Sequence, residues 1–370
     1  MSSPTSYRQP HDLHWTEHVS LDLFLRALHK TFLHPFIAWL IPLCLRAQAT
    51  PYSHPAFIIT VAYASLLSLV VLLAMVNRRI AYGLPRTVDL EEEVVVITGG
   101  ASGVGLLIAK IYGMRGVSVA VLDEKTPDRE GKDGLGFEEM PSVEYYRCNV
   151  GDEAQVEEVA RRINNDLGTP TILINCVAAS INGLPLLSLS SNAIQKTINA
   201  NLSSFFHTLQ AFLPGMQESP NGGTIVTVSS VLAYLTAAGL SDYTATKAAI
   251  TAVHKTVEAE LALSGANAKV KMLLVETGQI ATQLFERIKT PNKVFAPVLE
   301  PVQVAQKIVS VIDSGNGGLI RMPAYASLVS WYTVLPASIQ KLARCLSGID
   351  KAVQKAGYSA DEKKEGLKLS

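Results

Sequence analysis

Short apolar runs rich in β-branched residues alternate with longer segments of helical apolar spacing between residues 91 and 322. Val94–Thr98 and Val117–Leu122 have the length and composition of buried parallel strands, and Val104–Tyr112 between them has the spacing of a helix. Further strands are predicted at residues 143–147, 171–175, 223–229, 270–275 and 318–321, and further helices at 153–167, 242–263, 302–312 and through SSFFHTLQAFLPGM. This alternation predicts an α/β fold with a doubly wound parallel sheet and a ligand site at the carboxyl ends of its strands.

The first 90 residues follow a different pattern. No Asp, Glu, Lys or Arg lies between Arg46 and Arg78, and Ala56–Val76 is an apolar run of 21 residues. A helix rises about 1.5 Å per residue, so this run spans roughly 30 Å, the hydrocarbon thickness of a bilayer. It predicts a transmembrane helix; a buried helix of a soluble domain is the alternative interpretation. Arg78 and Arg79 follow, with Arg86 close behind, and the positive-inside rule then places the C-terminal bulk in the cytosol.

Two further apolar stretches are predicted to contact a membrane surface. Phe32–Leu45 has only 14 residues and contains two prolines, which suits an interfacial or re-entrant segment. Residues 325–346 combine apolar with aromatic and basic side chains, as interfacial helices do, whereas the charged end at 351–370 is predicted to fray. The chain thus divides into an N-terminal arm and membrane anchor (1–90), a single α/β domain (91–322) and a C-terminal extension (323–370).

Composition and charge exclude several functions. Of the 370 residues, 48% are hydrophobic, which is ample for a packed core. Lys plus Arg and Asp plus Glu each number 32, so no net charge favours nucleic acid as a partner. The four cysteines lie far apart, without the spacing of a zinc site or a disulfide framework. His11, His14 and His18 would share a helical face, but no nearby Cys or acidic cluster completes a site, and we expect no bound metal.

The turn between the first strand and the first helix of this domain is rich in glycine. Gly99, Gly103 and Gly105 let the backbone turn tightly and approach a pyrophosphate at the helix N-terminus, where free N–H groups favour negative charge. Asp123 ends the second strand, where a carboxylate can accept hydrogen bonds from ribose hydroxyls and repel a 2′-phosphate. No Lys or Arg lies in the glycine loop, so NAD is the preferred cofactor and NADP the alternative.

A second stretch carries groups suited to acid–base chemistry: SSVLAYLTAAGLSDYTATK, residues 229–247. Lys247 lies one helical turn after Tyr243, so its cation is expected to lower the phenol pKa from about 10 and to reach a ribose hydroxyl. A tyrosinate tuned in this way can take the proton of an alcohol while hydride leaves for a nicotinamide ring. Ser229 and Ser230, at the end of the preceding strand, are both candidates to hold the same substrate oxygen.

These residues resemble the short-chain dehydrogenase/reductase family over about residues 91–322. The resemblance is carried by T-G-x-x-x-G-x-G from Thr98 to Gly105 and by Y-x-x-x-K from Tyr243 to Lys247. It is also carried by Ser230, 13 positions before that tyrosine, and by Asn201 in NANLSSFF. It implies a Rossmann-like fold and an NAD(P)-dependent oxidoreductase acting on CH–OH groups. In the family the serine positions substrate, the tyrosine is the acid/base, the lysine tunes it and binds ribose, and the asparagine holds a water in the proton relay.

The family's site residues map onto this sequence one by one. The catalytic positions are Asn201, Ser230, Tyr243 and Lys247. The cofactor-binding positions are Gly99, Ser102, Gly103, Val104, Gly105, Asp123, Asn149, Val150, Asn175, Tyr243, Lys247, Gly278, Ile280 and Thr282.

Three positions depart from the family pattern. The usual Asn-Asn-Ala-Gly after the fourth strand is Asn175-Cys176-Val177-Ala178, the usual Asp after the third strand is Asn149, and the usual Pro-Gly after the sixth is Thr277-Gly278. None of these changes removes a catalytic group. They nevertheless leave a second function open, that of a catalytically inactive membrane scaffold that binds dinucleotide.

The N-terminal anchor, the AFLPGM motif and the long C-terminal extension resemble the membrane-associated retinol and hydroxysteroid dehydrogenase branch. That resemblance implies a lipophilic alcohol or carbonyl substrate, a homodimer formed through two long helices, and a location at the endoplasmic reticulum or lipid droplets. Retinoids, steroids and other lipids are not separated by these residues. The segment after Thr282 occupies the family's substrate-lid position, where Leu284, Phe285, Val294 and Phe295 suit either an apolar ligand or simple lid packing.

Overall fold

A computed structural model describes residues 20–125, 140–285, 288, 294–351 and 353. The chain forms two compact units, residues 1–81 with 292–297 and residues 82–291 with 298–370. The three N-terminal histidines, and most of the charged C-terminal end, lie outside the described residues.

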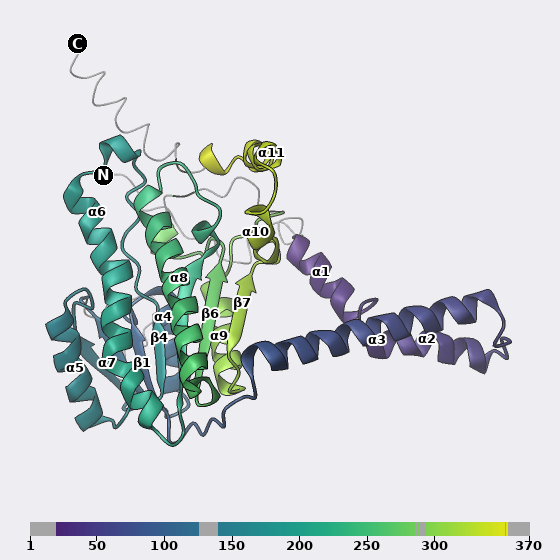
Figure 1. Cartoon of the computed structure of the whole chain (residues 1–370), viewed down its shortest axis with the longest axis horizontal. Helices are drawn as coiled ribbons and strands as arrows, with labels where there is room; N and C mark the ends of the chain where they lie inside the picture. The colour runs from purple at the N-terminus through teal and green to yellow at the C-terminus, as the bar shows by residue number, and fades with distance from the viewer. Residues whose placement is uncertain (1–19, 126–139, 286–287, 289–293, 352, 354–370) are drawn as a thin grey trace, which may run out of the picture. The chain divides into compact units, whose positions relative to one another are not determined.

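The second unit contains a seven-stranded parallel sheet with the strand order β3-β2-β1-β4-β5-β6-β7 (Figure 1). The strands are β1 (Val94–Thr98), β2 (Ser118–Asp123), β3 (Val143–Arg147), β4 (Ile172–Asn175), β5 (Gly223–Ser230), β6 (Val270–Thr277) and β7 (Gly318–Met322). The order reverses between β1 and β4, which opens a crevice at the carboxyl ends of these two strands. The predicted doubly wound parallel sheet is confirmed.

Helices cover both faces of this sheet. The α-helices of the second unit are α4 (Gly103–Gly113), α5 (Glu153–Asp166), α6 (Ser191–Ile198), α7 (Ser204–Glu218), α8 (Ser241–Ser264), α9 (Pro301–Asp313), α10 (Ala326–Tyr332) and α11 (Ala337–Ser347). Successive residues of β1 enter different cores: Val95 and Ile97 pack with α4 and α9, whereas Val94 and Val96 pack with α5, α7 and α8. The continuous apolar composition of the strands follows from this burial on both faces.

Short helical turns interrupt the regular elements. Four are 3₁₀ turns: η4 (Leu186–Ser188), η6 (Val231–Ala233), η7 (Ala266–Ala268) and η8 (Gln283–Phe285). The fifth, η5 (Asn199–Ser203), is a π turn that joins α6 to α7. The long helix predicted to run into SSFFHTLQAFLPGM is therefore two α-helices joined by a π turn, in which hydrogen bonds join residues five apart and Asn201 is buried.

The first unit contains α1 (Leu21–Lys30), α2 (Pro35–Ala47) and α3 (Pro55–Tyr82). α2 and α3 lie side by side (Figure 1), and Trp39 Nε1 donates a hydrogen bond to Ser68 Oγ at 3.0 Å between them. Among the described residues, α3 is the one helix that is long and apolar enough to cross a membrane, and its apolar side chains are almost all exposed. α1 and α2 together meet the same criterion as a pair bent by 49°.

The segment before β1 is held by a buried ion pair. Arg86 donates hydrogen bonds to both carboxylate oxygens of Glu93, at 2.7 and 2.9 Å, and its Nε donates to Thr224 Oγ1 at 2.8 Å. The Thr171 hydroxyl donates to the same carboxylate. Arg86 is therefore a buried residue paired with Glu93. The orientation inferred from the arginines that follow α3 stays a prediction.

Candidate active site

The carboxyl ends of the central strands bring the predicted site residues to one edge of the sheet. Thr98 of β1 pairs in register with Asn175 of β4, and Ser230 of β5 pairs with Thr277 of β6. Because all strands run parallel, the loops that follow them leave at the same edge. The glycine loop, the strand that ends in Ser230 and the helix that begins before Tyr243 therefore share one site.

The glycine loop is packed too tightly for side chains at two of its positions. Gly99 has φ +69°, and a Cβ there would lie 3.0 Å from Val177 Cα; a Cβ at Gly105 would lie 2.6 Å from the Gly99 carbonyl oxygen. Ser102 precedes α4 and is exposed, whereas Val104 is buried in the core. The loop thus presents backbone at the N-terminus of α4, where a pyrophosphate fits.

Asp123 fastens this loop to the end of β2. Its two carboxylate oxygens accept hydrogen bonds from the backbone N–H groups of Ala101, at 3.1 Å, and Lys125, at 3.0 Å. No pattern in the sequence indicated this structural role. The half-buried carboxylate also lies at the end of β2, where the sequence predicted a contact with an adenosine ribose.

Asn149 and Asn175 flank the adenine side and the centre of the site. Asn149 is exposed, and its Oδ1 accepts a hydrogen bond from Gly151 N at 2.9 Å, while Val150 is buried in the core. Asn175 Oδ1 accepts a hydrogen bond from the Thr208 hydroxyl at 2.9 Å, but its buried Nδ2 has no partner among the described residues. A buried donor without a partner is uncommon, and a bound cofactor is one group that can satisfy it.

The two serines at the end of β5 point to different partners. Ser230 Oγ donates to the Thr277 carbonyl at 3.3 Å and accepts a hydrogen bond from Leu232 N at 3.1 Å. Ser229 Oγ instead bonds Thr251 Oγ1 of α8 at 2.7 Å. Adjacent residues of a strand point to opposite faces of the sheet, so Ser229 points towards α8 and Ser230 to the other face.

Tyr243 and Lys247 lie together in the first turns of α8, each 3% exposed. The Lys247 ammonium is 5.6 Å from the centre of the Tyr243 ring and donates a hydrogen bond to the Val228 carbonyl at 3.0 Å. Phe285 packs edge-on against the same ring, with 6.4 Å between ring centres. The pair is therefore held in a dry environment at the end of β5.

Burial sets the pKa values of this pair. It raises the pKa of the Tyr243 phenol above its ordinary value and lowers that of Lys247 from 10.5 to about 8, because each charged form loses hydration. The sequence predicted a lowered phenol pKa. That prediction is wrong for these side chains alone, since burial disfavours the tyrosinate and raises the phenol pKa.

Asn201 and Asp242 cross-link the loops around α8. Asn201 Oδ1 accepts a hydrogen bond from Ala179 N at 2.6 Å, and its Nδ2 donates to Thr246 Oγ1 at 2.9 Å. Asp242, which the sequence reasoning missed, accepts hydrogen bonds from Tyr243 N, the Asn182 amide and the Thr197 hydroxyl. An acidic residue in the first turn of a helix was the available signal for this role.

The segment after β6 returns to the glycine loop. A Cβ at Gly103 would lie 3.6 Å from the Thr282 methyl, and Gly278 N donates to the Met322 carbonyl at 2.7 Å. Ile280 is buried and forms a bridge with Leu299. Thr282 therefore lies next to the glycine loop, at the carboxyl edge of the sheet where a dinucleotide is predicted to bind.

The four residues that the sequence predicted for the substrate lid belong to two different units of the chain. Phe285 is buried against Tyr243, and Leu284 beside it is half-buried. Val294 and Phe295 belong to the first unit and are 49% and 62% exposed; Leu21 N donates a hydrogen bond to the Val294 carbonyl. Across the described residues, no group of three His, Cys, Asp or Glu side chains is arranged to hold a metal ion.

Comparison with known proteins identifies the family. A model of the short chain dehydrogenase family matches residues 93–293. Retinol dehydrogenase 10-B of Danio rerio is 30% identical, covering 76% of this chain and 92% of its own, and short-chain dehydrogenase/reductase 3 of Homo sapiens is 30% identical, covering 67% and 81%. These relatives agree with the resemblance to the retinol dehydrogenase branch.

Solved structures agree on the fold. A short chain dehydrogenase from Burkholderia cenocepacia, crystallised in complex with NADP, has a TM-score of 0.56 and 23% identity, covering 70% of this chain and 99% of its own. A short-chain dehydrogenase from Streptomyces avermitilis has the same TM-score at 22% identity. With the sheet order, the glycine loop and the Tyr243–Lys247 pair in place, this chain belongs to the short-chain dehydrogenase family.

Proposed function

We propose that this protein is a membrane-anchored, NAD-preferring oxidoreductase that interconverts a lipophilic alcohol and its carbonyl compound. The observation that carries the proposal is the buried Tyr243–Lys247 pair, whose ammonium group bonds the Val228 carbonyl near the end of β5, the strand that ends in Ser230. A tyrosine and a lysine buried together at a ligand-binding edge are suited to proton transfer.

The side chains divide the chemistry among them. A nicotinamide cofactor supplies the carbon that accepts or returns the hydride. The Tyr243 hydroxyl exchanges a proton with the substrate oxygen, and the Ser230 hydroxyl hydrogen-bonds that oxygen and orients it. The Lys247 ammonium favours the tyrosinate electrostatically and hydrogen-bonds the ribose, and Asn201 keeps the chain beside α8 in place through Thr246.

The glycine loop and Asp123 support a dinucleotide with an unmodified ribose. Gly99 and Gly105 leave room for a pyrophosphate at the N-terminus of α4, and the unpartnered Asn175 amide lies between β1 and β4. The related Burkholderia protein was crystallised with NADP. In this chain the carboxylate of Asp123 at the ribose position favours NAD, because a 2′-phosphate beside it would add like charges.

Three features support a lipophilic substrate and a membrane location. α3 is exposed and apolar over the length of a bilayer. In α10, α11 and the link between them, seven large apolar side chains are exposed: Leu328, Trp331, Val334, Leu335, Ile339, Leu342 and Leu346. Residues 294–297, which follow the lid segment, belong to the same unit as α3. We propose an endoplasmic reticulum or lipid-droplet membrane with the α/β domain in the cytosol; the homodimer stays a prediction.

The first prediction concerns Tyr243. We expect Tyr243→Phe to lower kcat with lipophilic carbonyl or alcohol substrates by about 10²-fold or more, because the proton donor is lost, while NADH binding is unchanged. The matched control is Tyr234→Phe, whose hydroxyl bonds Glu276, and its kcat should stay within about threefold. Full-length protein in detergent and NADH absorbance provide the assay. Turnover that survives in Tyr243→Phe would contradict the mechanism, and cofactor binding without any turnover by the wild type would favour the scaffold.

The second prediction concerns cofactor choice. Asp123→Asn keeps an oxygen for the Ala101 N–H group but removes the negative charge, so the Kd ratio of NADPH to NADH should fall by about tenfold or more. Asp152→Asn, at the cap of α5, should leave the ratio unchanged. Fluorescence titration of reduced cofactor measures both constants. An unchanged ratio in Asp123→Asn would show that the carboxylate does not select the cofactor.

The third prediction concerns the stability of the buried lysine. A lowering of its pKa from 10.5 to about 8 means that the charged amine destabilises the folded state by on the order of 3 kcal/mol. This penalty is fully present below pH 8 and fades between pH 8 and 10.5, where the folded state has already lost the proton. Lys247→Met should therefore raise the Tm of cofactor-free protein at pH 7 by about 5 °C while abolishing turnover, and the difference should shrink at pH 10. A lower Tm at pH 7 would contradict it.

The fourth prediction concerns the anchor. Wild-type protein should stay in the membrane pellet after an alkaline carbonate wash, and a C-terminal epitope should be open to protease in sealed microsomes. The double substitution Leu69→Arg and Leu72→Arg in α3 should release the protein from the membrane pellet, because each arginine costs about 3 kcal/mol inside a bilayer. Leu263→Arg, at an exposed position of α8, should stay in the pellet. Release of the wild type would rule out a transmembrane α3.

A further inference from the structure

The connection between Ser230 and Tyr243 is held on its outer side by the C-terminal extension. This connection, residues 231–240, leaves β5 and leads into α8, so its position decides how the two side chains face one another. The extension lies outside residues 93–293, which the family model matches. Its contacts with the connection therefore involve residues beyond the stretch that the family model matches.

A pair of charged residues fastens the extension to the connection. Arg344 Nη1 donates hydrogen bonds to the carbonyl and the hydroxyl of Thr236, at 2.6 and 3.2 Å, and Arg344 Nε donates to Asp350 Oδ2 at 3.2 Å. Ala238 N in turn donates to Asp350 Oδ1 at 3.1 Å. We call Arg344 and Asp350 the clasp, because together they bind two backbone groups of the connection.

Beyond the clasp, Val353 fills a niche made by two glycines. A Cβ at Gly239 would lie 2.9 Å from a Val353 methyl, and a Cβ at Gly183 would lie 3.8 Å from the same methyl. Both glycines have positive φ, +82° and +68°, which other residues rarely adopt. Val353 itself is 3% exposed. The two loops thus leave a space that this valine occupies.

The niche continues towards Tyr243. Val353 packs with Ala237 and Leu240 in one apolar cluster, against which Ile181, Leu232, Ile288 and Ile349 also pack. Ile288 N donates a hydrogen bond to the Phe285 carbonyl at 2.9 Å, and Phe285 lies edge-on against Tyr243. The cluster is thereby linked to the catalytic ring through the lid segment.

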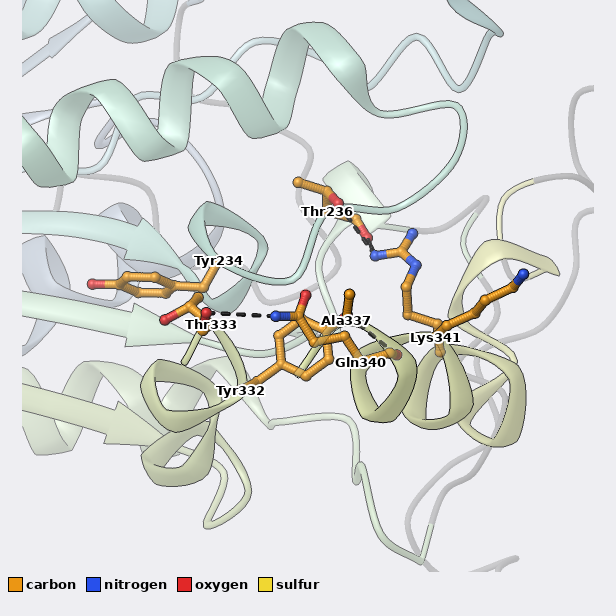
Figure 2. A pocket seen from close by; sticks show the side chains of 8 residues that line it. Tyr234, Thr236, Tyr332, Thr333, Ala337, Gln340 and Lys341 are labelled. Atoms are coloured by element: carbon orange, nitrogen blue, oxygen red, sulfur yellow. Dashed lines mark hydrogen bonds between the residues drawn. The ribbon is translucent and has the colours of Figure 1, made fainter. Parts of the chain in front are cut away.

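The clasp also separates this cluster from a more polar space. A cavity of about 440 Å³ is lined by residues of the connection and of α10, α11 and their link. Figure 2 shows the side chains that line it. Its lining side chains include Tyr234, Thr236, Gln340 and Lys341, together with Arg344 of the clasp, and none of them belongs to the apolar cluster. Thr236 lines the cavity, whereas its neighbour Ala237 belongs to the cluster, so the clasp stands at the border between the two.

We infer that the C-terminal extension forms the outer wall of the substrate site, with Val353 a specificity-determining residue for apolar substrates and the clasp of Arg344 and Asp350 a positioning pair that holds this wall against the connection. This inference rests on the proposed oxidoreductase function. The apolar part of a substrate bound near Tyr243 would extend towards the cluster that Val353 closes. The volume of the Val353 side chain therefore limits the size of the substrate.

The first arm of the test changes the wall. Full-length wild type, Val353→Ala and the control Val334→Ala are compared with NADH and a panel of aliphatic and polycyclic aldehydes and ketones of increasing size. Val353→Ala should raise the kcat/KM ratio of the bulkiest to the smallest active substrate by about tenfold, since the loss of two methyl groups enlarges the site. Val334→Ala, at an exposed position of the same extension, should leave the ratio unchanged.

The second arm loosens the clasp. Arg344→Ala and Asp350→Ala should raise KM for the panel by about tenfold, with kcat within about threefold and the NADH Kd unchanged, and Asp350→Asn should recover part of the loss because it keeps an acceptor for Ala238 N. Lys341→Ala, which lines the same cavity, should behave as the wild type.

The outcomes separate the two proposals. A size ratio that does not move in Val353→Ala, or clasp variants in which kcat and cofactor binding fall together, would overturn the wall while leaving the oxidoreductase intact. A wild type that turns over no member of the panel would overturn the proposed function and the wall with it.

Discussion

All seven strands of the sheet run in one direction, and the chemistry of this protein depends on that constraint. A parallel strand delivers the loop that follows it to the same edge as its neighbours, so Gly99 and Tyr243, 144 positions apart, belong to one site. Strands that are buried on both faces hold this edge rigid. The residues at the edge are therefore free to serve binding and proton transfer without also having to build the core.

The polar residues of the site are held by cross-links as much as by the sheet. Asp123 fastens the glycine loop, Asn201 ties the π turn to α8, and Asp242 binds two neighbouring segments at the start of α8. These hydrogen bonds satisfy polar groups that would otherwise be buried without partners. They hold the Tyr243–Lys247 pair in a dry environment, where electrostatic effects are strong and where the charged forms of both side chains are disfavoured.

The C-terminal extension packs against this centre from outside the part that the family model matches. The family match ends at residue 293, whereas the clasp and Val353 lie near the C-terminus and still contact the connection between Ser230 and Tyr243. In the proposed function, the chemistry and the shape of the substrate site come from different stretches of the chain. This division allows one catalytic framework to accept different substrates by changing what packs against it.

The sequence by itself determined the strands, most of the helices, the glycine loop and the Tyr243–Lys247 pair, because apolar periodicity and short spacings are local properties of the chain. It selected Ser230 over Ser229 only through the spacing of a family resemblance, named no partner for Arg86, and predicted a lowered pKa for Tyr243. The tertiary structure decided the partners and the pKa: Ser230 bonds the Thr277 carbonyl, Arg86 pairs with Glu93, and burial raises the phenol pKa. Each depends on which distant residues surround a side chain, and the niche for Val353 exists only where two separate loops meet.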